Sequence, residues 1–207
     1  MYALVTDNEI TQIITNPKTM VIGDVRYPAK IFQLWSKSEL NAIGIYEVIT
    51  NSTNFKDEKW YINTNESYSF ADNQVTRSWG TATPKAHADT LWTQQDSDDG
   101  DLPDDKEVGD VKVEGLKTQL IRTIKQQASG LLAPTDWYVV KASEVSDYSV
   151  PSNIATYRAS VRTKSNEMET AITNANDTPA LETLYTYTEQ DDGSVTRPLG
   201  ELPTLES

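Results

Sequence analysis

Residues 116–131 read LKTQLIRTIKQQASGL, and this stretch decides the fold of the second half of the chain. Its apolar side chains recur at helical spacing and lie on one face of a predicted helix. They are Leu116, Leu120, Ile121, Ile124, Ala128 and Leu131. We expect Gly130 and Pro134 to end this helix. An apolar face of this width has to be buried, so the stretch predicts a helical module.

A second, longer helix is predicted to follow, opened by Pro151 and Ser152. Its apolar stripe is close to a heptad repeat that Lys164 breaks. The stripe consists of Ile154, Tyr157, Val161, Met168 and Ile172. We expect the two helices to pack as an intramolecular hairpin, and packing between subunits is the alternative. Lys164 favours a short bundle over a long coiled coil.

The rest of this helical module, which spans 116–207, is predicted to hold one more helix and a tail. Thr178 is the predicted cap and Pro179 the first helical residue, before the apolar positions at 181–185. Residues 197–203 read RPLGELP, with two prolines and a glycine. We expect this tail to run extended along another surface.

Residues 1–80 are predicted to form a β-rich module. The pairs Asp7-Asn8 and Asp72-Asn73 tolerate the positive φ of tight hairpin turns, and Gly23-Asp24 indicates a third hairpin. Many short strands at close spacing favour an antiparallel meander. The predicted strands are 2–6, 9–14, 20–22, 25–27, 45–49, 60–62, 68–70 and 75–79. Together with the helical module, this predicts the α+β class.

One short helix is predicted to interrupt the strands. Ser36 and Glu39 form a capping box, in which each side chain bonds the backbone amide of the other residue. Trp35 and Leu40 flank the cap where a hydrophobic staple would close, and Gly44 fits the left-handed position after the helix.

An acidic connector is predicted at residues 81–115, because like charges at this density repel one another. Asp96 and Asp98 begin like a calcium-binding EF-hand loop, and Glu107 follows eleven residues after Asp96. Gly100, however, comes one position too early for that loop. A solvated charge run is therefore the preferred interpretation, with calcium at Asp96, Asp98 and Asp101 as the alternative. We predict no other cofactor.

Composition excludes several classes of function. The 207 residues include 18 Lys and Arg against 31 Asp and Glu, a net charge of −13. This charge argues against binding nucleic acid through its phosphates and against an anionic membrane surface. No apolar run approaches the ~20 residues of a membrane helix, and we do not expect the N-terminus to be a signal peptide. The absence of Cys excludes disulfides, thiolate nucleophiles and Cys-based metal sites.

Catalysis is the weaker hypothesis for this sequence. His87 is the only histidine, and no nucleophile motif accompanies it. A pair of carboxylates for glycoside hydrolysis stays open, because such pairs meet only in the fold. The tryptophans could line a sugar-binding surface, although packing in a core or an interface is the preferred interpretation. They are Trp35, Trp60, Trp79, Trp92 and Trp137.

The segment LLAPTDWYVV at 131–140, followed by Pro151, Ile154, Tyr157-Arg158 and Val161-Arg162, carries a family resemblance. It resembles a pattern in tail-fibre assembly proteins and tail assembly chaperones of tailed bacteriophages. The runs IFQLWS at 31–36 and NAIGIY at 41–46 are similar to the opening of tail-associated proteins of marine phages. The resemblance implies a non-enzymatic role in a virion or in tail assembly.

The same motif has a physical interpretation of its own. Thr135 or Asp136 can cap the structure that follows the first helix, and Trp137 is expected to pack back against that helix. Arg158 and Arg162 could pair with Asp136 or with carboxylates of a partner. We prefer the interpretation that these residues lock the helical hairpin. The predicted site comprises Leu131, Leu132, Thr135, Asp136, Trp137, Tyr157, Arg158 and Arg162.

These observations predict a structural adaptor that works by protein–protein contact. The expected partners are other phage tail or fibre proteins and further copies of the chain. The expected location is the tail of the virion, and the host cytoplasm during assembly. The β-rich module ahead of the motif favours an adaptor over a pure chaperone. A transient assembly chaperone and a host-glycan-binding receptor protein are the alternatives.

Overall fold

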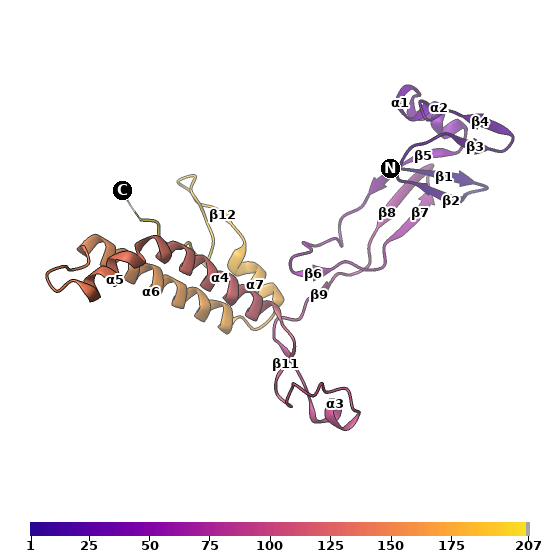
Figure 1. Cartoon of the computed structure of the whole chain (residues 1–207). Helices are drawn as coiled ribbons and strands as arrows, with labels where there is room; N and C mark the ends of the chain where they lie inside the picture. Colours follow the sequence, from indigo (N-terminus) through magenta and orange to yellow (C-terminus); the bar gives the residue numbers. More distant parts are fainter. Residues whose placement is uncertain (206–207) are drawn as a thin grey trace. The chain divides into compact units, whose positions relative to one another are not determined.

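The computed structural model describes residues 1–205 and divides into two compact units (Figure 1). Unit 1 is Met1–Thr83 and unit 2 is Pro84–Ser207. Strands dominate unit 1 and long helices dominate unit 2. The predicted α+β class is therefore confirmed, with the strand-rich region first and the helices after it.

Unit 1 is built on a curled five-stranded sheet with the strand order β2-β1-β5-β8-β7. Two of its hairpins turn where the sequence predicts, since Asp7, Asn8, Asp72 and Asn73 all have positive φ. The strands are β1 (Tyr2–Thr6), β2 (Glu9–Ile14), β5 (Ile45–Thr50), β7 (Ser67–Ala71) and β8 (Gln74–Ser78).

The sheet is not the antiparallel meander that the sequence predicts, because β5 and β8 pair in parallel. The hairpin of β7 and β8 docks on β5 through its second strand. Val75 of β8 is fully buried, whereas β7 has no buried residue. The strand that carries the buried Val75 thus takes the interior place in the sheet, and its direction makes the pairing with β5 parallel.

Each face of β1 contributes to a different apolar cluster, as the period of two along a strand requires. Ala3 and Val5 pack with Val75 on one face. Tyr2 and Leu4 pack on the other face against a cluster of Ile14, Ile31, Phe32, Leu40 and Ile45. Four short elements contribute to that second cluster: β3 (Met20–Ile22), β4 (Val25–Tyr27), α1 (Ile31–Leu34) and α2 (Lys37–Ala42).

The predicted capping box at the start of α2 is confirmed. The Ser36 amide donates to Glu39 Oε2 at 2.8 Å, and the Glu39 amide donates to Ser36 Oγ at 3.3 Å. The Ser36 hydroxyl and the Ser36 amide, which both donate to Glu39 Oε2, lower the pKa of Glu39. Gly44 follows the helix with a φ of 81°, and a Cβ there would lie 2.6 Å from the Val5 carbonyl oxygen. Only glycine fits this turn and this approach.

Unit 2 is built on the helical hairpin of α4 (Leu116–Leu132) and α6 (Ser152–Asn174). The predicted stripe of α6 is fully buried, as Ile154, Tyr157, Val161, Met168 and Ile172. On α4, Leu116, Leu120, Ile124 and Ala128 are buried, whereas Ile121 and Leu131 are partly buried. Gly130 does not end α4 as predicted. Leu131 and Leu132 pack against the cluster around Tyr157 and Val161 and carry the helix past the glycine.

The chain between α4 and α6 continues as a 3₁₀ turn, η1 (Ala133–Thr135), and a further helix, α5 (Asp136–Glu144). The last helix, α7 (Thr178–Tyr185), is capped by Asp177 rather than by Thr178, because Asp177 Oδ1 accepts the Ala180 amide at 2.8 Å. The Thr178 hydroxyl is buried and donates instead to the Lys85 carbonyl at 2.6 Å.

The C-terminal tail packs along the helices after a small hairpin of β12 (Thr188–Glu189) and β13 (Val195–Thr196). The Leu199 amide donates to the Leu184 carbonyl at 3.0 Å, and the Leu199 side chain is buried. Leu202 joins the apolar cluster of Ala128, Tyr157 and Val161. The tail runs over another surface as predicted, with one added turn at Arg197–Gly200.

The segment predicted as a connector, 81–115, contains ordered elements of its own. They are β9 (Thr83–Pro84), which pairs with β6 (Tyr61–Ile62), together with β10 (Thr90–Leu91), α3 (Gln94–Asp98) and β11 (Val111–Val113). Most of the segment belongs to unit 2. We call residues 90–113 the acidic hairpin. A capping box of Thr93 and Asp96 starts α3, a local signal that the charge density of the segment obscured.

Candidate protein-interaction site at the end of the helical hairpin

Arg158 of α6 holds the junction between α4 and α5. Its side chain is 7% exposed, and one guanidinium nitrogen donates to the Leu132 carbonyl at 3.0 Å and to Thr135 Oγ1 at 2.6 Å. The other terminal nitrogen lies 2.8 Å from Asp136 Oδ1. One buried cation therefore contacts the last turn of α4, the turn η1 and the first residue of α5.

Tyr157 extends this arrangement to the preceding carbonyl of α4. Its hydroxyl donates to the Leu131 carbonyl at 3.2 Å, and the Thr135 hydroxyl donates to the Leu132 carbonyl at 2.7 Å. The last carbonyls of a helix lack partners within the helix and carry partial negative charge. Tyr157 and Arg158 supply a donor and a cation to that end of α4. We call this arrangement the Arg158 node.

The structure brings together six of the eight residues predicted from the motif. The node contains Leu131, Leu132, Thr135, Asp136, Tyr157 and Arg158. The predicted pairing of Arg158 with Asp136 is confirmed. Thr135 does not cap α5 with its side chain, because the hydroxyl is already bonded to Leu132 and Arg158.

Arg162 lies on the surface beside the node. It makes one long hydrogen bond, from Nη1 to the Arg158 carbonyl at 3.4 Å, and no carboxylate within residues 1–205 pairs with it. In the described part of the chain, only the pair of Arg158 forms.

Trp137 does not pack against α4, contrary to the prediction. Its side chain is 51% exposed, and its ring contacts the neighbouring Tyr138 ring at a centroid distance of 3.8 Å. The Lys141 ammonium lies 5.8 Å from the Trp137 ring and 4.3 Å from the Tyr148 ring. The reason is the turn η1, which leads directly into a new helix and leaves Trp137 facing solvent.

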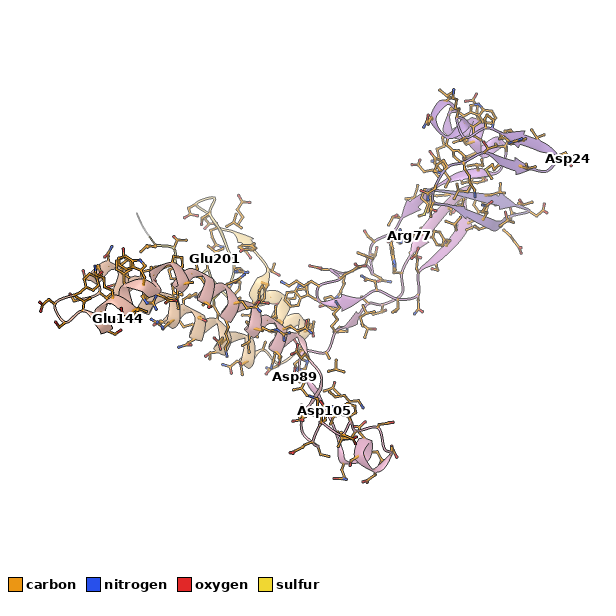
Figure 2. All side chains as sticks on the ribbon, in the orientation of Figure 1. Asp24, Arg77, Asp89, Asp105, Glu144 and Glu201 are labelled. Carbon is orange, nitrogen blue, oxygen red and sulfur yellow. The ribbon has the colours of Figure 1, made fainter. Side chains whose placement is uncertain are left out.

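Helix α5 has an apolar sequence but no buried residue. Trp137, Val139 and Val140 of the helix and Val145 after it are all exposed, with exposed fractions between 44% and 52%. A helix that is apolar on several sides is normally found buried, and a concentration of exposed apolar side chains marks an interaction site. We call Trp137, Val139, Val140 and Val145 the α5 surface. Figure 2 shows Glu144 at the far end of this helix.

Sequence reasoning missed the three valines of this surface. A signal for them is present in the run WYVV at 137–140, where no polar residue interrupts the apolar side chains. A helix that packs one face on a core would alternate apolar and polar residues at helical spacing. The run therefore belongs to a helix whose apolar side chains are not all directed at its own core.

The other sequence candidates have different surroundings. Trp60 is buried, and Trp35, Trp79 and Trp92 are partly buried, so Trp137 is the most exposed of the five tryptophans. His87 contributes its backbone carbonyl, which accepts the Lys117 amide at 3.0 Å at the start of α4.

Two of the three carboxylates of the calcium alternative, Asp96 and Asp98, are engaged with neighbouring side chains. Asp96 pairs with Lys112 and accepts the Thr93 amide at 2.8 Å, and Asp98 accepts from the Gln94 side chain at 2.8 Å. Lys112 and Thr93 lower the pKa of Asp96 to about 2. Within residues 1–205, no three acidic or histidine side chains are grouped closely enough to hold a metal ion.

Comparison with protein-family models, with curated proteins and with solved structures finds no match for this chain. In the part of the chain that the structure describes, none of the helices combines the length and the apolar character that crossing a bilayer requires.

Proposed function

We propose that this chain is a non-enzymatic component of a bacteriophage tail or tail fibre that acts through protein–protein contacts. Its partners are other tail or fibre proteins and further copies of itself. It assembles in the host cytoplasm and stays in the tail of the virion. The observation that carries the proposal is the α5 surface, an apolar helix with no buried residue at the end of a well-packed hairpin.

The Arg158 node supports this proposal because it fixes α5 to a rigid scaffold. A presented helix binds better when it is already in place, since less conformational freedom is lost on binding. The node orders the start of α5 through Thr135 and Asp136 and leaves Trp137 exposed. Tryptophan is also the residue type most enriched at the centres of protein interfaces. The motif that resembles tail proteins thus coincides with the Arg158 node, which holds the apolar helix α5 in place.

The first experiment is mass spectrometry of purified virions. We expect the chain to be found in the particles in several copies. Absence from the particles would reject the structural role and favour a transient assembly chaperone. Hydrolysis of host polysaccharide by the pure protein would contradict the non-enzymatic part of the proposal.

A paired substitution tests the α5 surface itself. The variant Trp137→Ser/Val140→Ser removes two exposed apolar side chains, so we expect the fold to survive and incorporation into particles to fall at least about tenfold. The matched control is Val21→Ser/Val25→Ser, whose side chains belong to unit 1 and are 62% and 52% exposed. Equal incorporation of the two variants would contradict a role for α5. Loss of a glycan-array signal in the Trp137 variant alone would favour the receptor alternative.

A further inference from the structure

A basic groove runs between α4 and α6 beside the Arg158 node. It has a volume of about 380 Å³ and is lined by Lys125, Ser129, Arg162, Ser165 and Asn166, with Asp136 and Arg158 at one end. A second hollow on α4 shares Lys125 and Ser129 with it and adds Arg122.

This groove lies in a part of the chain that carries net positive charge. Residues 116–174 contain seven Lys or Arg against five Asp or Glu, a net +2 in a chain of −13. Lys125 and Arg158 have carboxylate partners in Glu169 and Asp136. Among residues 1–205, Arg162 bonds only a backbone carbonyl, which leaves most of its donors free for an anion.

The complementary charge lies on the acidic hairpin. Residues 96–110 contain eight Asp or Glu against Lys106, a net −7. Asp101, Asp104 and Asp105 are exposed, and within residues 1–205 their carboxylates make no hydrogen bond or ion pair. Figure 2 shows Asp105 on this hairpin. A set of free carboxylates and a groove with a free guanidinium are thus present on the same chain.

The acidic hairpin is held away from the groove of its own chain. Asp89 at its base accepts the Gly115 amide and the Thr118 hydroxyl, each at 2.7 Å, and this fixes the base to the first turn of α4. Ser129 of the groove lies thirteen residues beyond Leu116 on the same helix, which is about 20 Å at 1.5 Å per residue. A hairpin tied to the start of α4 is better placed to reach the groove of another molecule.

We infer that the acidic hairpin of one copy docks in the basic groove of a second copy. Arg162 pairs there with the carboxylates of Asp101, Asp104 and Asp105, because a guanidinium matches the geometry of a carboxylate. The donor and acceptor surfaces differ, so the contact is heterologous and builds a ring or an open head-to-tail filament. This inference rests on the proposed function, since it names self-assembly as one of the protein–protein contacts.

Two variants test the docking, each altering one side of it. Asp101→Asn/Asp104→Asn/Asp105→Asn neutralises the hairpin and keeps the groove, and Lys125→Gln/Arg162→Gln neutralises the groove and keeps the hairpin. In analytical ultracentrifugation, the apparent molar mass of the wild-type protein is expected to rise with its concentration. Each variant alone should self-associate at least about tenfold more weakly, from the loss of several exposed charge pairs. Lys18→Gln/Lys37→Gln, which alters two exposed lysines of unit 1, should behave as wild type.

Mixing the two variants gives the decisive result. Each retains the surface that the other lacks, so an equimolar mixture should form a 1:1 dimer and stop there. A mixture that stays monomeric while the wild type associates would overturn the docking, as would a monomeric wild type. A monomeric chain that still enters virions through α5 rejects this inference and keeps the proposed function. A chain that self-associates as described but is absent from virions keeps this inference and rejects the proposed structural role in the tail.

Discussion

The helical hairpin and the acidic hairpin belong to the same unit but are ordered by different forces. The helical hairpin buries apolar residues along both α4 and α6. The acidic hairpin buries no residue between 90 and 113 and is held by polar contacts around Trp92, Thr93 and Asp96. Apolar burial gives the cooperative stability of a domain, whereas local hydrogen bonds order a segment that can open alone.

The largest effect is expected from a cavity in the helical hairpin. Ile172 is fully buried on α6, so Ile172→Ala should lower the free energy of unfolding by about 3–4 kcal/mol. Val113→Ala in the acidic hairpin removes a side chain that is 60% exposed and should cost less than about 0.5 kcal/mol. Chemical denaturation followed by circular dichroism at helical wavelengths measures both. Similar losses in the two variants would show that the two hairpins unfold as one cooperative body.

The next effect tests the polar node inside the apolar hairpin. Arg158→Met leaves the Leu132 carbonyl and the Thr135 hydroxyl without their buried cation and should cost about 2 kcal/mol. Hydrogen exchange should also become faster over α5. Arg162→Met, on the surface one turn later, is the matched control and should stay within about 0.5 kcal/mol of wild type. If both variants exchange at the same rate over α5, the node does not position that helix.

Two glycine substitutions are expected to change the stability of unit 2 in opposite directions. One is at Gly115, between the acidic hairpin and the helical hairpin, and the other is at Gly130. A Cβ on Gly115 would collide with the backbone carbonyl of Ala88, so Gly115→Ala should destabilise unit 2 by about 1–3 kcal/mol. Gly130 lies inside α4 with open space around it, and Gly130→Ala should stabilise the helix by about 0.5–1 kcal/mol. Thermal unfolding measures the pair. A neutral Gly115→Ala would mean that residues 86–89 do not need to pack closely on α4.

Local signals predicted much of the fold. The pairs Asp7-Asn8 and Asp72-Asn73 and the box of Ser36 and Glu39 specify turns and a cap within a few residues. Parallel pairing of β5 and β8 was not predicted, because it depends on which strand of a distant hairpin pairs with β5. The predicted helix end at Gly130 and the predicted cap at Thr178 were wrong for the same reason, since tertiary contacts outweighed the local preferences of these residues.

The candidate site was predicted in part. Pairing between Arg158 and Asp136 follows from opposite charges that lie near each other at one end of the helical hairpin. The exposure of Trp137 does not follow from its sequence neighbours, because it depends on η1 leading directly into α5. In the acidic hairpin, the number of charges predicted exposure correctly. It did not predict order, which comes from one capping box and one ion pair with Lys112.

The smallest effect is local and depends on pH. Lys112 and the Thr93 hydroxyl and amide lower the pKa of Asp96 to about 2 from an ordinary value of 3.8. A carboxylate with a lowered pKa stabilises the folded hairpin above about pH 4, and this contribution is lost as the pH falls through about 2. Hydrogen exchange over residues 90–113 should therefore become faster in that window. Asp96→Asn should show the faster exchange already at pH 7, with global unfolding unchanged, while Glu107→Gln, at an exposed position of the same hairpin, should behave as wild type. Equal protection in Asp96→Asn and wild type at pH 7 would mean that strand pairing alone orders the acidic hairpin.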